Sequence, residues 1–116
     1  MTNALATREQ DTLSAQAKEY IGQAKAPATV EAYRSDWQHF TDWCRAQGVQ
    51  AMPATPEVLS AYLGELATTY KPSTLQRRLA AISQAHQMAD VDNPAHSSPV
   101  KLTMQGIRRA KGTAPN

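Results

Sequence analysis

The stretch that decides the fold is residues 27–47, which reads PATVEAYRSDWQHFTDWCRAQ. Its apolar side chains recur in steps of three and four, the spacing that places them on one face of a helix. They are Val30, Tyr33, Trp37, Phe40 and Cys44. Pro27 suits a first helical turn, and Gly48 suits the left-handed residue that often ends a helix. The stretch therefore predicts a long amphipathic helix that buries this face.

Similar patterns on both sides of this stretch predict further helices. One helix covers about residues 8–24. Three more begin near Thr55, Lys71 and Ser98, and each of these three has a proline in its first turn. Strand-forming Val and Ile are scarce. The expected buried residues of the later helices are Leu59, Tyr62, Leu63, Leu66, Leu75, Leu79, Ile82, His86, Val100, Met104 and Ile107.

These helices, joined by short connections, predict an all-α bundle of four to five helices in a single domain. The domain is expected to span residues 8–111. Residues 1–7 are expected to be a flexible N-terminus, and residues 112–116 the start of an interdomain linker.

The chain has 116 residues, which is enough for one domain that buries its own core. Cys44 is the single cysteine, so an internal disulfide is excluded and a reducing cytoplasm is the expected location. No apolar run approaches the roughly 18 residues of a membrane helix. The first ten residues lack the pattern of a signal peptide.

Positive charge is concentrated in the last part of the chain. Residues 71–116 hold seven basic and two acidic residues, a net charge of +5 within a total of +2. This asymmetry favours a polyanionic partner, and the alternative is an ordinary solvated basic surface. The basic residues are Lys71, Arg77, Arg78, Lys101, Arg108, Arg109 and Lys111.

Signals for catalysis or for a cofactor are missing from the sequence. The histidines and Cys44 show no metal-ligand spacing, so no metal site is predicted. Cys44 and most tyrosines fall on apolar faces, which favours core positions, and no glycine-rich phosphate loop occurs. Neither an enzyme nor a cofactor is expected.

The start of the predicted helix after Lys71 has the residue types of a DNA contact. At about 100° per residue, Arg77 lies nearly opposite Leu75, Ser73 and Thr74 also face outward, and Arg78 lies on the flank. Short hydroxyls, arginine and a helix N-terminus suit phosphate and base-edge contacts. The alternative is that both arginines only solubilise the surface.

Three segments resemble the core-binding domain of tyrosine recombinases, the phage integrase family. Residues 29–37, followed by Phe40 and Trp43, resemble its second helix, and residues 72–82 with His86 resemble its fourth. The ending 106–109 is similar to the close of its fifth helix. The resemblance runs from about residue 8 to 111 and is nearest to the Cre-like branch, whose domain has five helices.

This resemblance implies a SAM-like helical fold that forms half of a C-shaped clamp around double-stranded DNA. The second and fourth helices would cross in the major groove, and the first and fifth would meet neighbouring recombinase subunits. The implied DNA-binding residues are Thr29, Ala32 and Ser35, then Ser73, Thr74 and Arg77, with Arg108 and Arg109 on the last helix; Lys71 and Arg78 complete the predicted set. Ala26 departs from the family pattern, because the serine often found there would cap the second helix.

The resemblance also implies that the catalytic tyrosine and its arginine, lysine and histidine partners belong to a different, C-terminal domain. The chain is therefore expected to bind DNA in a sequence-directed manner, without catalysing strand exchange, and to be a monomer until it meets DNA. The alternative function is a helical protein-interaction module that uses its first and fifth helices and does not bind DNA.

Overall fold

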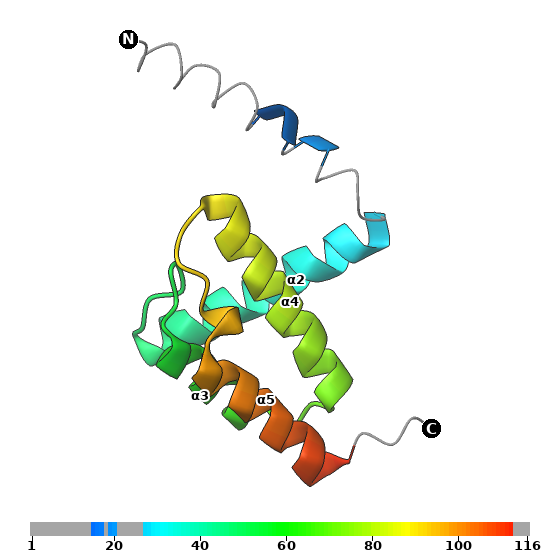
Figure 1. Ribbon diagram of the computed structural model, residues 1–116, viewed down its shortest axis with the longest axis vertical. Helices are drawn as coiled ribbons and strands as arrows, with labels where there is room; N and C mark the ends of the chain where they lie inside the picture. The colour runs from blue at the N-terminus through cyan, green and yellow to red at the C-terminus, as the bar shows by residue number, and fades with distance from the viewer. Residues whose placement is uncertain (1–14, 18, 21–26, 113–116) are drawn as a thin grey trace. The chain divides into compact units, whose positions relative to one another are not determined.

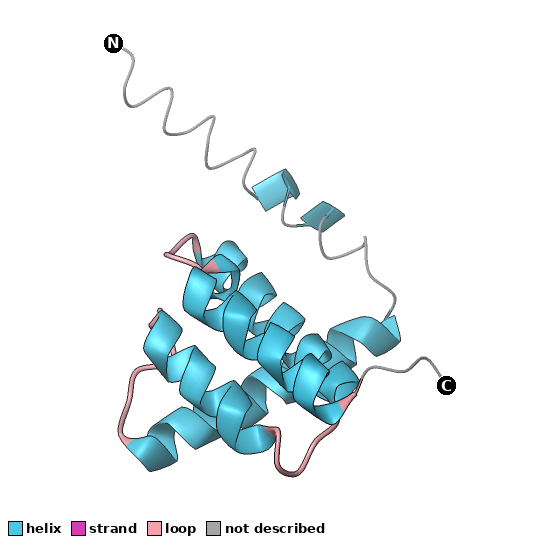
Figure 2. Ribbon diagram, turned by 60° about the horizontal axis from the view of Figure 1, so that its bottom comes forward, coloured by secondary structure: helices cyan, strands magenta, loops and turns pink. Residues whose placement is uncertain are grey.

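The computed structural model describes residues 15–17, 19–20 and 27–112. These residues are helical or in loops and contain no strand, which confirms the all-α class (Figure 2). They belong to two compact units, Met1–Ala32 and Tyr33–Asn116. The expected first helix falls mostly outside the described residues, of which 15–17 and 19–20 are helical.

Four helices and one short 3₁₀ turn follow, in the order α2, α3, α4, η1 and α5 (Figure 1). Their bounds are Pro27–Gln47, Pro56–Leu66, Pro72–Ala89, Pro94–His96 and Ser98–Lys111. Each element begins at or one residue before a proline, as the sequence predicts. Helix α5 continues to Lys111. The expected flexible N-terminus, residues 1–7, and all but the first residue of the expected linker, 112–116, lie outside the described residues.

Local chemistry explains where these elements stop and start. Gly48 follows α2 with a φ of 72°, and Asp90 ends α4 in the left-handed conformation with a φ of 57°. The Thr55 hydroxyl accepts the Val58 N–H at 3.1 Å, which caps α3. Asn93 caps η1 through Ala95 N and donates its amide to Ser83 Oγ at 2.9 Å, so it ties the turn to α4.

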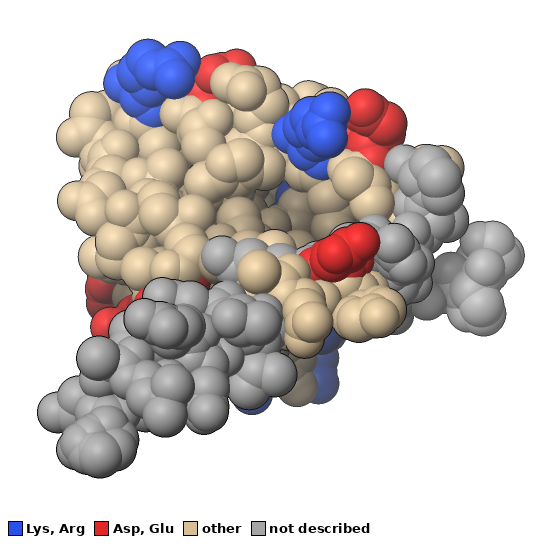
Figure 3. Space-filling model, turned by 90° about the horizontal axis from the view of Figure 1, so that it is seen from above, with Lys and Arg blue, Asp and Glu red and all other residues tan. Residues whose placement is uncertain are grey.

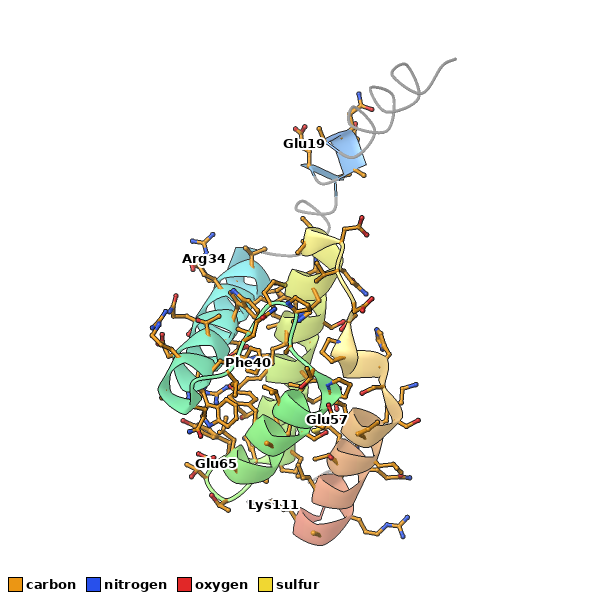
Figure 4. The ribbon with its side chains drawn as sticks, turned by 90° about the vertical axis from the view of Figure 1, so that its left-hand side faces the viewer. Glu19, Arg34, Phe40, Glu57, Glu65 and Lys111 are labelled. Carbon is orange, nitrogen blue, oxygen red and sulfur yellow. The ribbon has the colours of Figure 1, made fainter. Side chains whose placement is uncertain are left out.

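The core of the second unit lies between α2, α3, α4 and α5, with α3 running beside α5. Phe40 is fully buried among the helices (Figure 4). Its ring centroid lies 4.9 Å from that of Tyr62. All the expected buried residues of α3, α4 and α5 are buried, which confirms the helical pattern. Trp37, expected at the centre of the buried face, is instead only partly buried, because it packs at the edge of the core.

His86 joins the loop before α3 to α4. Its Nε2 accepts the Ala54 N–H at 2.9 Å, so that nitrogen carries no proton. Its Nδ1 lies 2.8 Å from the Ile82 carbonyl oxygen and therefore carries the proton that it donates. The histidine is completely buried with both nitrogens satisfied, and the expectation of a structural role is confirmed.

Candidate nucleic-acid interface

The N-cap and first turns of α4 carry five of the ten side chains predicted to meet DNA. Lys71, Ser73 and Arg77 are exposed, and Thr74 is half-buried. The described N-terminal end of α4 has no acidic residue in its first turn and no side-chain hydrogen bond at its cap, Lys71. No carboxylate of the first turn therefore neutralises the positive end of the helix dipole or accepts hydrogen bonds from the first N–H groups.

Arg77 is held by a residue that the sequence prediction left out. Its Nε donates to Oδ2 of Asp36 at 2.7 Å, and its Nη2 donates to Oδ1 at 2.9 Å. Asp36 lies on α2 and is only 2% exposed, while the Arg77 side chain remains 51% exposed. The hydrogen bond to Asp36 raises the pKa of Arg77 above its ordinary value. Arg77 is therefore not a free surface cation but one member of a paired link between two helices.

Arg78 was expected on the exposed flank of α4, and this expectation is wrong. The residue is 8% exposed, because α2 and Tyr70 cover that flank. Its guanidinium carbon lies 4.2 Å from the centroid of the Tyr70 ring, a cation–π contact. Its Nε lies 3.6 Å from Asp36 Oδ1, which is too long for a hydrogen bond but close enough for an ion pair.

His39 and Tyr62 complete the surroundings of Arg78. The Arg78 Nη1 lies 3.3 and 3.4 Å from the two ring nitrogens of His39, and the Tyr62 hydroxyl lies 2.8 Å from His39 Nδ1. Burial, and next the positive charge of Arg78, lower the pKa of His39, while Asp42 and Asp36 act weakly in the opposite direction. Burial raises the pKa of Tyr62 to about 12. Both groups are therefore neutral near pH 7.

We call these six side chains the Asp36 cluster: Asp36, His39, Tyr62, Tyr70, Arg77 and Arg78. With His39 and the tyrosines neutral, one carboxylate meets two guanidinium groups, and one positive charge is left over. Among the six, Arg77 brings this charge to the surface, because Arg78 is buried. The sequence contained a sign that Asp36 is buried. It precedes Phe40 by one helical turn and so lies on the face of α2 that packs against the core.

The predicted positions on α2 are divided between the two units. Thr29 and Ala32 belong to the first unit and are half-buried, whereas Ser35 belongs to the second and is exposed. Ser35 directly precedes Asp36, which places it beside the Asp36 cluster along the chain. Ala26 lies outside the described residues.

The end of α5 adds further positive charge. The Arg108 Nη1 donates to Gln76 Oε1 at 2.7 Å, which connects α5 to the residue preceding Arg77. Arg109 is exposed, and the Lys111 ammonium donates to the Ala67 carbonyl at the end of α3. All three are basic residues in the last turn of α5, where they also favour the helix dipole.

A groove of about 430 Å³ runs between α4, η1 and α5. Lys101 and Arg108 supply positive charge to it, Gln76 and Gln105 supply amides, and Leu79 and Met104 are among its apolar lining residues. None of the described residues that line it is acidic. The groove can therefore accommodate an anionic group beside an apolar one.

Basic side chains do not gather on every face. On the face seen in Figure 3, Lys and Arg stand singly with acidic side chains close by, and uncharged residues cover most of the described part. Arg45 illustrates this arrangement, since its Nη1 lies 3.1 Å from Asp42 Oδ1 near the end of α2. Exposed arginines outside the start of α4 thus provide comparisons for the candidate interface.

Cys44 and the possible metal ligands were the remaining candidates for a chemical site. Burial raises the pKa of Cys44 to about 11, so its thiol is a poor nucleophile, and its position in the core is confirmed. Within residues 15–17, 19–20 and 27–112, no group of three or more His, Cys, Asp or Glu side chains is arranged to hold a metal ion. No described helix is long and apolar enough to cross a membrane.

Comparison with known families defines the class of this helical domain. Residues 17–90 match the model of the phage integrase N-terminal SAM-like domain. The match covers more than half of the chain, and the chain belongs to this family of tyrosine recombinase N-terminal domains.

A curated relative supports the same assignment. The chain is 42% identical over 106 residues to a protein of Selenomonas ruminantium described as "Integrase/recombinase xerD homolog". The match covers 89% of this chain and 31% of that relative. The chain thus spans about a third of the length of the recombinase that it matches.

Proposed function

We propose that this chain binds duplex DNA as the non-catalytic N-terminal domain of a site-specific tyrosine recombinase. The observation that carries the proposal is the start of α4, where exposed Lys71, Ser73 and Arg77 surround a helix N-terminus without an acidic residue in its first turn. Backbone N–H groups, hydroxyls and a guanidinium are the donors that proteins direct to phosphates and base edges.

The proposed interface combines this helix start with the exposed part of α2. Ser35 precedes Asp36 on α2 in the second unit. Thr29 and Ala32 belong to the first unit and are proposed contacts there. Arg108 and Arg109 would extend it at the end of α5, with Arg108 directed by its bond to Gln76. Arg78 is assigned to the support of Asp36, because its burial leaves no surface for a DNA contact.

Other recombinase subunits are the second proposed partner. Leu102 is 64% exposed on α5, and a large exposed apolar side chain favours a protein contact. We propose that this contact forms between subunits gathered on DNA and that the chain alone is a monomer. Light scattering that detects a stable dimer at micromolar concentration without DNA would contradict this proposal.

The DNA-binding proposal is tested by titrating the chain with a random-sequence duplex at several salt concentrations. A dissociation constant on the order of 10⁻⁴–10⁻⁶ M is expected near physiological salt, because the domain supplies only part of a clamp. Lys71→Ala should weaken binding of all sequences and reduce the salt slope by about one.

Arg45→Ala is the matched control, since it removes the same charge from an exposed site that is paired with Asp42. Equal weakening by both substitutions would mean that only bulk charge acts and that the proposed interface is wrong. Absence of any duplex binding at low salt would favour the protein-interaction alternative.

A further inference from the structure

The guanidinium of Arg77 has two edges that can each donate a pair of hydrogen bonds. Asp36 occupies the edge formed by Nε and Nη2, at 2.7 and 2.9 Å. Because the group is planar, the second edge, formed by Nη1 and the other Nη2 hydrogen, faces away from Asp36. The Arg77 side chain as a whole is 51% exposed, which leaves space for a ligand beside it.

The carboxylate that holds Arg77 is itself fixed. Asp36 is 2% exposed and has Arg78 as a second cationic neighbour, 3.6 Å from Oδ1. Arg78 in turn packs on Tyr70 and approaches His39, which is bonded to Tyr62. A chain of buried and half-buried contacts therefore limits the orientations of the Arg77 side chain, and less rotamer freedom is lost when it binds a ligand.

We propose that Asp36 is a positioning residue that presents the outer edge of Arg77 to a pair of hydrogen-bond acceptors on DNA. This inference rests on the DNA-binding function proposed above. Guanine O6 and N7, or two oxygens of one phosphate, supply such a pair, and arginine binds both with two parallel hydrogen bonds. Asp36 contributes through Arg77 and does not touch the DNA.

The negative charge of Asp36 makes the sign of the effect diagnostic. If bulk charge alone governs binding, removing a carboxylate near the interface strengthens the attraction to DNA. If Asp36 positions Arg77, its removal weakens binding although the protein becomes more positive. The two explanations thus predict opposite changes from one substitution.

The decisive experiment compares Asp36→Asn with Asp42→Asn in the full 116-residue chain. Both substitutions remove one negative charge from α2, and Asp42 is exposed and bonded to Arg45. With a random 30-base-pair duplex as the probe, Asp36→Asn should weaken binding by about fivefold or more, the effect of roughly one lost hydrogen bond. Asp42→Asn should leave binding unchanged or strengthen it.

Arg77→Lys is the second variant, and it tests the contact made by the outer edge of Arg77 if Asp36→Asn does not fold. Lysine keeps the charge but lacks the two-donor edge. Wild type and Arg77→Lys are each used to select duplexes from a randomised pool. If guanine is the acceptor, wild type enriches a guanine that the variant does not, with an affinity difference of about 5- to 150-fold on that sequence. If phosphate is the acceptor, both select the same bases, and the variant binds every sequence more weakly.

The proposal is overturned if Arg77→Lys, and Asp36→Asn where it folds, bind and select as wild type does at every salt concentration. It is also overturned if Asp36→Asn and Asp42→Asn change binding in the same direction by the same factor. Failure of wild type to bind any duplex is a different result, because it rejects the DNA-binding function itself.

Discussion

Asp36 is an acidic residue on the face of α2 that turns to the core, and its burial requires compensation by cations. Two consecutive arginines of α4 provide it in different ways. Arg77 forms two hydrogen bonds and stays half-exposed, whereas Arg78 is buried against Tyr70 and His39. Neighbouring residues of one type thus have separate tasks, since they differ by about 100° around the helix.

His39 predicts how stability depends on pH. Its pKa is lowered in the folded chain, chiefly by burial, so below its ordinary value of 6.5 the unfolded chain binds the proton more readily. The contribution of neutral His39 to stability is therefore complete above about pH 6.5 and is lost as the pH falls through the folded pKa. Thermal melts of wild type between pH 5 and 7.5 should show this decline.

His39→Gln should flatten that part of the profile, because glutamine does not titrate. His96→Gln is the matched control, since it removes an exposed histidine of η1. Equal slopes for wild type and His39→Gln would show that other groups cause the acid loss.

At the scale of the element, α3 and α4 begin in different ways. Helix α3 has a hydroxyl cap from Thr55 and an acidic residue, Glu57, in its first turn. Helix α4 has Lys71 as its N-cap, with an extended backbone, φ −77° and ψ 160°, and without a side-chain cap hydrogen bond. The uncapped start costs stability but keeps a carboxylate away from the proposed phosphate contact.

Lys71→Asp is expected to separate stability from DNA binding. The backbone at this position already suits a cap, so an aspartate should raise the free energy of unfolding by about 0.5–2 kcal/mol. It should also weaken duplex binding more than Lys71→Ala, because a negative charge replaces a positive one. Urea unfolding and duplex titration measure the two effects, and a variant that is more stable yet binds DNA as tightly as wild type would contradict the proposed role of the α4 N-terminus.

At the scale of the whole molecule, two of the described tyrosines, Tyr62 and Tyr70, are engaged within the second unit. Tyr62 is buried with a pKa of about 12, and Tyr70 packs beneath the Arg78 guanidinium. Arg78 and His39 are engaged with Asp36 and Tyr62 inside the domain. These contacts connect α2, α3 and α4.

The chain is accordingly expected to form no covalent complex with DNA. Incubation with a nicked duplex that traps tyrosine-linked intermediates, followed by a denaturing gel, should yield no protein–DNA adduct. An adduct that involves any tyrosine of residues 1–116 would refute this expectation. A full-length tyrosine recombinase serves as the positive control.

The sequence by itself determined the helices from residue 27 onward, their starts at prolines, and the buried faces of α3, α4 and α5. These features depend on spacing along one helix and on chemistry within one turn, which are local properties. Trp37 was misjudged because the position of a residue on a helix face does not reveal how far a neighbouring helix covers it.

Only the tertiary structure decided what the two arginines of α4 do. Helical geometry placed Arg77 opposite Leu75 but carried no information about Asp36, which lies 41 residues earlier and approaches only when α2 packs against α4. The burial of Arg78 has the same origin, since Tyr70 and α2 cover it. Ion pairs between distant segments depend on how the helices are oriented against one another, which the residue pattern of one helix does not reveal. This orientation determines which charged side chains remain at the surface.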